Sequence, residues 1–111
     1  MNLHRSEAVS LAEGIAEFVT DANTYDVAVC PPFIYLDAVS TTISGSPVAL
    51  GAQNMYSQGN GAYTGEISAS MLTDAGCQYV ILGHSERREL FRECDVVVND
   101  KLRAALQNGL K

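Results

Sequence analysis

The residues best suited to chemistry form one short cluster: His84, Ser85, Glu86, Arg87 and Arg88. The preceding residues 79–82 are apolar, bulky and not alternating, which is typical of a strand buried on both faces of a parallel sheet. Gly83 permits a tight turn, and Ser85 is a good N-cap residue for a helix. His84 is therefore predicted at the carboxyl end of a strand beside a helix N-terminus, whose N–H groups disfavour a protonated imidazole and keep the ring neutral.

The elements that must hold this cluster alternate regularly along the chain. Short apolar runs at 26–30, 48–52 and 79–82 predict three strands. Amphipathic helices are predicted over 33–43 and after the N-cap residues Ser6, Ser68 and Asp95, with polar residues 20–24 ending the first helix. Because helices alternate with strands, we expect one α/β domain with a parallel sheet and right-handed crossovers.

A long irregular segment follows the second predicted strand. It runs from Gln53 to Gly65 and contains two tyrosines, Tyr56 and Tyr63. A loop of this length is unusual as a mere connection, and such loops commonly bind something.

Composition excludes several classes of function. The formal net charge is −6 with only 7 Lys and Arg residues, which argues against a nucleic-acid surface. No apolar run approaches the ~18 residues of a membrane span. The three cysteines, Cys30, Cys77 and Cys94, have no metal-ligand spacing and are expected to be reduced, mostly buried thiols. We expect a soluble, cytoplasmic protein without a metal or cofactor.

Two blocks of sequence resemble one known family. The segment Gly83–Arg88, preceded by Val80-Ile81-Leu82, is similar to the fourth-strand signature of the triosephosphate isomerases. Residues 51–56 followed by 61–68 resemble that family's third strand and the long loop after it. The resemblance runs in order along the whole chain.

The resemblance implies a fold, an activity and a set of catalytic residues. The fold is a partial (β/α)8 barrel over residues 1–111, with three parallel strands and four helices on one face. The activity is the interconversion of dihydroxyacetone phosphate and glyceraldehyde 3-phosphate in glycolysis, without a cofactor. His84 takes the place of the histidine that polarises the substrate carbonyl, and Ser85 and Glu86 are its local supports.

The resemblance also implies that catalytic groups lie outside this chain. The family's lysine precedes the position of Met1, and its glutamate base and phosphate-binding loops follow the position of Lys111. Since a general base must reach the proton it removes, the chain alone is expected to be inactive. The open sheet face is expected to be covered by a second copy of the chain or by a complementing barrel segment.

The resemblance extends to subunit contacts. It places Gln53 near the pocket, and it makes Gln53, Thr64, Glu66 and Arg87 candidate contacts with a second subunit. The plain interpretation of Glu66 and Arg87 is that they are solvated surface charges, and that of Gln53 is a loop residue.

Two other interpretations remain open. The chain could be a non-catalytic, self-associating part-barrel, with His84 an ordinary buried histidine. It could also be an independent flavodoxin-like domain, if the helices divide between both faces of the sheet.

Overall fold

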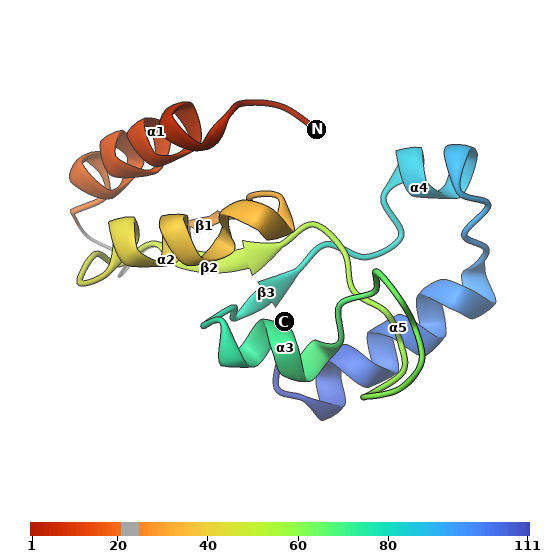
Figure 1. Ribbon diagram of the computed structural model, residues 1–111. Helices are drawn as coiled ribbons and strands as arrows, with labels where there is room; N and C mark the ends of the chain where they lie inside the picture. Colours follow the sequence, from red (N-terminus) through yellow and green to blue (C-terminus); the bar gives the residue numbers. More distant parts are fainter. Residues whose placement is uncertain (21–24) are drawn as a thin grey trace.

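Helices and strands alternate as the sequence predicts (Figure 1). The structure is a computed structural model that describes residues 1–20 and 25–111. In chain order its elements are α1 (Arg5–Phe18), β1 (Ala28–Val29), the 3-10 helix η1 (Phe33–Tyr35), α2 (Leu36–Ile43), β2 (Ala49–Ala52), α3 (Ala69–Asp74), β3 (Tyr79–Val80), α4 (Ser85–Leu90) and α5 (Asp95–Gln107). The four predicted helices are α1, α2, α3 and α5, and α4 is the helical turn expected after His84. Of residues 20–24, predicted to end the first helix, 21–24 lie outside the described residues.

The three strands form one parallel sheet in the order β1-β2-β3. Ala28 pairs with Ala49, and Gly51 pairs with Tyr79. Each ladder has fewer paired residues than the predicted apolar runs contain. The arrowheads of β2 and β3 point towards α4, so His84 lies at the carboxyl edge of the sheet, as predicted (Figure 1).

The two faces of the sheet are covered unequally. Paired residues of parallel strands share a face, and alternate residues along a strand point to opposite faces. One face carries Val48, Leu50 and Ala52, which are at most 6% exposed. The other face carries Ala28, Cys30, Gly51, Tyr79 and Ile81, of which Ala28 is exposed and Ile81 is 39% exposed. The prediction of strands buried on both faces is therefore wrong for Ala28 and Ile81, because the four helices leave the second face partly open, while Gly51 on the same face is buried.

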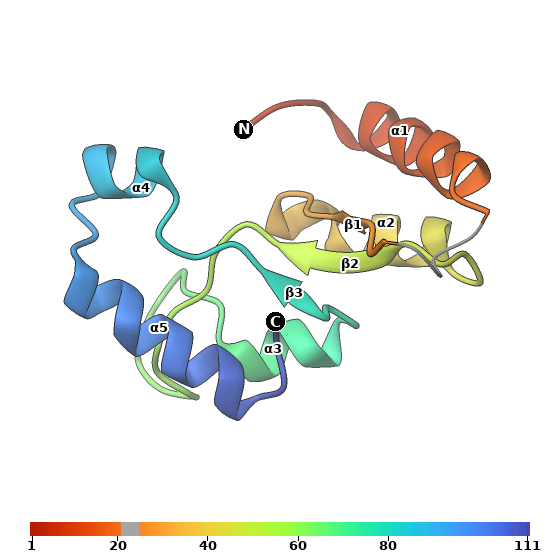
Figure 2. The ribbon, with the colours of Figure 1, turned by 180° about the vertical axis from the view of Figure 1, so that it is seen from behind.

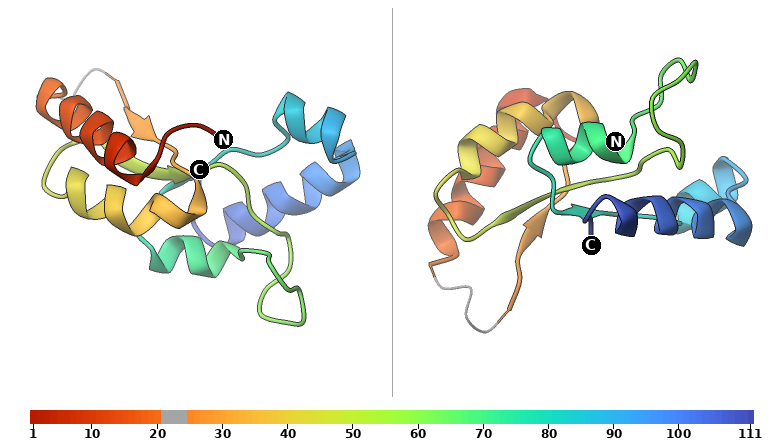
Figure 3. Two further views of the ribbon diagram at one scale, coloured as in Figure 1. Left: turned by 45° about the horizontal axis from the view of Figure 1, so that its top comes forward. Right: turned by 90° about the horizontal axis from the view of Figure 1, so that it is seen from below.

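One apolar cluster joins the four helices to the covered face. Its buried members include Ala8 and Ala12 from α1, Val39 from α2, Leu72 from α3 and Ala105 from α5. The helix α1 packs against α2, which packs on β2. The first and last helices, α1 and α5, lie at opposite ends of the molecule (Figures 2 and 3).

Both outer helices expose large apolar side chains. Leu11 and Phe18 of α1 are 56% and 85% exposed, and Leu102 and Leu106 of α5 are 47% and 63% exposed. Apolar side chains at these spacings form a helix face that normally packs against another element. The described part of the chain supplies no such element for them.

The ends of the helices partly follow the predicted capping residues. Ser68 caps α3 by accepting a hydrogen bond from the Met71 N–H at 3.3 Å, as predicted. The first helix begins at Arg5 with His4 as its N-cap, so the prediction of Ser6 is wrong. The reason is that Glu7, three residues after His4, completes a capping box: its Oε2 accepts a hydrogen bond from the His4 N–H at 2.7 Å.

The final residue of the chain pairs with β3. The Lys111 N–H donates to the Gln78 carbonyl at 2.9 Å, and the Lys111 carbonyl accepts from the Val80 N–H at 3.0 Å. These two hydrogen bonds have the slanted pattern of a parallel ladder. The free edge of β3 is thus already occupied by one residue in register.

The three cysteines differ in how far they are buried. Cys77 is buried, Cys30 is partly buried and Cys94 is exposed, and all three are free thiols. The prediction that the cysteines are mostly buried is therefore wrong for Cys94.

Among residues 1–20 and 25–111, no helix has the length and apolar character needed to cross a membrane.

Candidate active site

His84 lies in the turn between β3 and α4 and is the N-cap of α4. Its backbone is extended, with φ −53° and ψ 143°, and its ring Nδ1 accepts a hydrogen bond from the Glu86 N–H at 3.2 Å. The prediction of Ser85 as N-cap is therefore wrong by one residue, because the imidazole nitrogen serves as the acceptor that a serine hydroxyl would otherwise supply. Ser85 is the first residue of α4 and is exposed.

The capping hydrogen bond determines which ring nitrogen is free. Because Nδ1 accepts from the Glu86 N–H, it cannot carry a proton at the same time, so the neutral ring holds its proton on Nε2. The Glu86 carboxylate lies 3.8 Å from Nδ1 and is 76% exposed, which makes the backbone N–H the stronger partner. The His84 side chain is 49% exposed, so an Nε2–H donor is available to a carbonyl oxygen.

Two arginine contacts hold the turn around His84. The Arg88 Nε donates to the Gly83 carbonyl at 2.9 Å, and its Nη1 donates to Asp95 Oδ1 at 2.7 Å. Asp95 was predicted to cap α5, but Cys94 is the N-cap and Asp95 is the first helical residue. Its carboxylate is thus free to bind Arg88 and tie the start of α5 to the turn.

A buried charged cluster lies behind α4. Glu93 Oε1 accepts hydrogen bonds from Lys101 Nζ at 2.6 Å and from Arg87 Nε at 2.7 Å. Lys101 Nζ also donates to Asn54 Oδ1 at 2.8 Å. The side chains of Lys101 and Glu93 are 4% and 7% exposed. Burial alone would raise the pKa of the Glu93 carboxyl, but the hydrogen bonds and charges of Lys101 and Arg87 outweigh it and hold this pKa below its usual range.

Three of the four members of this cluster, Glu93, Lys101 and Asn54, were not predicted from the sequence as functional residues. Arg87 was predicted as a subunit contact, yet here its guanidinium pairs within the chain and lies 4.7 Å from the centre of the Phe91 ring. One signal could have revealed Lys101: it lies three residues after Val98 and four before Ala105, on the buried side of α5. A lysine in that position needs a buried partner.

The other predicted contact residues lie apart from His84 or on the surface. Gln53 is exposed, and its Nε2 donates to the Cys30 carbonyl at 2.8 Å, which links the ends of β1 and β2. Thr64 and Glu66 are exposed in the loop between β2 and α3. Their role as subunit contacts stays a prediction.

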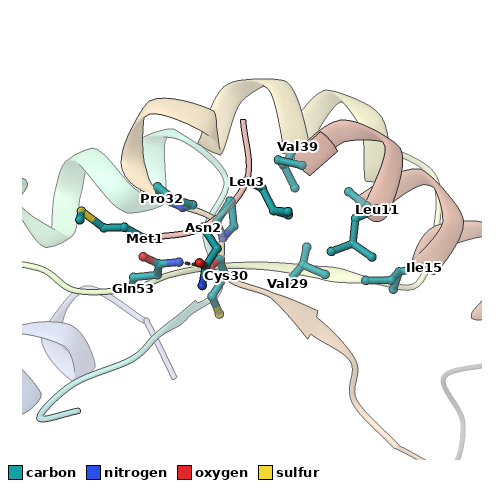
Figure 4. Close-up of a pocket in the computed structure, with 13 residues that line it drawn as sticks. Met1, Asn2, Leu3, Leu11, Ile15, Val29, Cys30, Pro32, Val39 and Gln53 are labelled. Carbon is teal, nitrogen blue, oxygen red and sulfur yellow. Dashed lines mark hydrogen bonds between the residues drawn. The ribbon is translucent and has the colours of Figure 1, made fainter. Parts of the chain in front are cut away.

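An apolar cavity of about 260 Å³ lies between α1 and the sheet (Figure 4). Leu11, Ile15, Val29 and Val39 point into it, and Gln53 and Asn2 lie at its rim. His84 is not among its lining residues. The cavity is therefore separate from the candidate site around His84, which lies at the exposed edge beside α4.

The parallel α/β segment that carries His84 is similar to known proteins. The sequence model of the family "Triosephosphate isomerase" matches residues 1–111. This chain belongs to the triosephosphate isomerase family.

Individual relatives agree with the family assignment. A triosephosphate isomerase of Herpetosiphon aurantiacus is 54% identical over 106 residues, which are 96% of this chain and 42% of the relative. That of Rhodopirellula baltica is 51% identical over 110 residues, which are 99% of this chain and 43% of the relative. The chain thus spans less than half the length of these triosephosphate isomerases.

A solved structure confirms the partial barrel. The crystal structure of triosephosphate isomerase from Bartonella henselae superimposes with a TM-score of 0.90 at 36% identity, covering 99% of this chain and 45% of that one. The chain is therefore a (β/α)8 barrel segment, as predicted. This also excludes the flavodoxin-like alternative, because the matched barrel keeps its helices on one side of the strands.

Proposed function

We propose that residues 1–111 supply the carbonyl-polarising histidine, His84, of a triosephosphate isomerase that interconverts dihydroxyacetone phosphate and glyceraldehyde 3-phosphate. One observation carries this proposal: Nδ1 of His84 is held by the Glu86 N–H at 3.2 Å, which leaves an Nε2–H donor at the exposed carboxyl edge of the sheet. Ser85 and Glu86 begin the helix that fixes the ring.

The proposed reaction uses that donor while a proton moves between neighbouring carbons. A general base removes a proton from the carbon beside the carbonyl, the C–H electron pair forms a carbon–carbon double bond, and the carbonyl oxygen gains negative charge. His84 Nε2–H stabilises this charge by a hydrogen bond. The hydroxyl proton on the neighbouring carbon then moves to the former carbonyl oxygen, and the neighbouring oxygen re-forms a carbonyl as the first proton is returned to the former carbonyl carbon, which completes the isomerisation.

We place the base and the phosphate-binding lysine in protein segments other than residues 1–111. Two observations support this placement: the chain covers 42–43% of its relatives, and one face of its sheet is apolar and partly open. By this proposal the isolated chain binds and converts no triose phosphate, and a complementing barrel segment restores turnover.

A second copy of the chain is the other proposed partner. Gln53, Thr64, Glu66 and Arg87 are the proposed contacts, and the first three are exposed on the surface. We place the reaction in the cytoplasm, where an exposed free thiol such as Cys94 remains reduced.

A chimera tests the proposal. Residues 1–111 replace the matching segment of the Herpetosiphon aurantiacus relative, and isomerisation is measured in both directions. We expect an active chimera, and His84→Gln should lower kcat by roughly 10²- to 10⁴-fold because the positioned donor is lost.

The matched control for the chimera is His4→Gln. His4 is exposed at the start of α1, far along the chain from His84, and its replacement should leave kcat within about twofold. An inactive but folded chimera, or equal losses in the two variants, would contradict the proposal.

A non-catalytic, self-associating part-barrel is the alternative. The apolar open face, with Ile81 39% exposed and Ala28 exposed, favours association in either case. The alternative predicts a defined oligomer of the isolated chain together with an inactive chimera, whereas the isomerase proposal requires an active one.

A further inference from the structure

The chain buries two charged side chains among its described residues, Glu93 and Lys101. Burying an ion pair rarely adds stability compared with well-packed apolar residues of the same volume. This pair is also incompletely satisfied, because Glu93 Oε2 is buried and accepts no hydrogen bond from the described part of the chain. A cluster of this kind is therefore poorly explained as a device for stability alone.

The contacts of the cluster run from the sheet to the helix that His84 caps. Asn54 lies two residues beyond the end of β2 and binds Lys101 of α5 at 2.8 Å. Lys101 binds Glu93 at 2.6 Å, and Glu93 binds Arg87 of α4 at 2.7 Å. The Arg87 N–H in turn donates to the His84 carbonyl at 2.9 Å.

Apart from the Arg88 hydrogen bonds to Gly83 and Asp95, the helix α4 has few other contacts that hold it in place. It is six residues long, and none of its side chains is buried. Glu93 contacts it twice, through the side chain of Arg87 and through a backbone hydrogen bond from the Glu93 N–H to the Arg87 carbonyl at 3.3 Å. A short helix without buried side chains depends on such contacts for its orientation.

We propose that Glu93 is a positioning residue that sets the orientation of the His84 imidazole by fixing α4 to α5 and to the end of β2. This inference rests on the proposed role of His84 as the carbonyl-polarising group. When Glu93 holds Arg87, the Glu86 N–H stays in place to bind Nδ1, and the proton stays on Nε2. Without that contact α4 shifts, the capping hydrogen bond weakens, and the ring populates the other tautomer.

Nitrogen NMR of the His84 ring and hydrogen exchange of the Glu86 amide test this directly on the 111-residue chain. Glu93→Gln should shift both His84 ring nitrogen signals towards a mixture of tautomers and speed Glu86 exchange by roughly three- to tenfold, as expected for loss of one hydrogen bond. Glu89→Gln is the matched control: Glu89 lies on the same helix and is exposed, so its replacement should change neither signal.

A second variant keeps the test decisive if Glu93→Gln unfolds. Arg87→Met removes the link at its most accessible end, where Arg87 is 28% exposed, and leaves the Glu93–Lys101 pair intact. It should reproduce the His84 and Glu86 changes, while Arg103→Met on the exposed side of α5 should not. Unchanged His84 signals in a folded Glu93→Gln or Arg87→Met chain would overturn the proposal.

The chimera separates this inference from the proposed function. Glu93→Gln should lower its kcat by roughly tenfold or more with KM within about twofold, because a misdirected donor weakens transition-state binding more than substrate binding. If the chimera is inactive but the His84 signals respond to Glu93→Gln, the proposed function fails and the positioning role stands. If kcat falls while the His84 signals are unchanged, the positioning role fails.

Discussion

The two nitrogens of the His84 ring serve different purposes. Nδ1 accepts a hydrogen bond from the Glu86 N–H and so caps α4, while Nε2 is the nitrogen proposed to bind a ligand. The same hydrogen bond that starts α4 therefore selects the tautomer of the ring. A substitution that disturbs the helix start must also disturb the chemistry proposed for His84.

Replacing Lys101 tests the buried cluster at the level of stability. Lys101→Met leaves the buried Glu93 with Arg87 as its remaining partner and should lower the free energy of unfolding by about 3 kcal/mol. Arg103→Met, at an exposed position of the same helix, should change it by less than about 0.5 kcal/mol. Urea unfolding of both variants measures the difference, and equal values would show that the pair contributes nothing.

The Glu93 carboxyl should also give the chain an acid-sensitive stability. Its pKa in the folded state lies below the ordinary value of 4.5, so its contribution is complete above that value and is lost as pH falls through the lower, folded pKa. Unfolding free energies measured between about pH 7 and about pH 3 should fall less steeply for Glu93→Gln than for the unaltered chain. The exposed control Glu89→Gln should keep the steeper fall.

The cysteines should differ in reactivity. The N–H groups of Val97 and Val96 lower the pKa of the exposed Cys94 thiol, whereas burial, with a smaller contribution from Cys30, raises the pKa of Cys77 to about 11. Since the thiolate is the nucleophile, iodoacetamide at neutral pH should alkylate Cys94 well before Cys77. Peptide mapping over time measures the order, and faster labelling of Cys77 would contradict it.

Sequence alone located the catalytic candidate but not what supports it. His84 could be placed because an apolar strand, a glycine and a helix start are contiguous in sequence. Lys101 and Asn54 are 47 residues apart, and no sequence pattern around either residue predicts the hydrogen bond between them. The exchange of N-caps from Ser85 to His84 could not be predicted either, since it depends on one hydrogen bond between the Glu86 N–H and the His84 ring.

Among the elements, the turn between β3 and α4 is the most constrained. Gly83 has φ +64°, and a Cβ there would lie 2.9 Å from Val98 Cγ1. Gly83→Ala should therefore lower the free energy of unfolding by about 1–2 kcal/mol or more through backbone strain alone, and should also displace His84. Thermal unfolding with the His84 ring signals measures both effects.

Replacing a second glycine, Gly14, should stabilise the chain in the same thermal unfolding experiment. Gly14 lies inside α1, and a Cβ there would meet no atom within 4 Å. Gly14→Ala should raise the free energy of unfolding by up to about 1 kcal/mol, because alanine favours helix. Destabilisation by Gly14→Ala would mean that α1 is not helical at this point in solution.

Element types and order were predictable because each element has its own local pattern. Hydrophobic spacing identified α1, α2, α3 and α5, and Ser68 marked the start of α3. The exposure of Ile81 was not predictable from the strand pattern. The apolar residues of this strand are typical of a sheet covered on both faces, but the described residues do not cover the face that carries Ile81.

For the whole molecule, the open face of the sheet governs behaviour in solution. We expect the isolated chain to associate as its concentration rises, because apolar residues such as Ile81 then become buried. Ile81→Gln should raise the dissociation constant by roughly 10- to 100-fold. Light scattering after size exclusion measures this.

The control for association is Ile34→Gln. Ile34 is 79% exposed in η1 and lies outside the open face, so its replacement should leave the dissociation constant unchanged. A chain that remains monomeric at every concentration would contradict the prediction and would show that the open face tolerates water.

The sequence separation between Asn54 and Lys101 also affects the rates of folding and unfolding. Each β–α unit is local and can form early, whereas the bond from Lys101 to Asn54 closes a loop of 47 residues and can form only after both flanking units have met. Interactions absent from the folding transition state act on the unfolding rate. The buried cluster should thus set the lifetime of the native chain and leave the speed of its formation almost untouched.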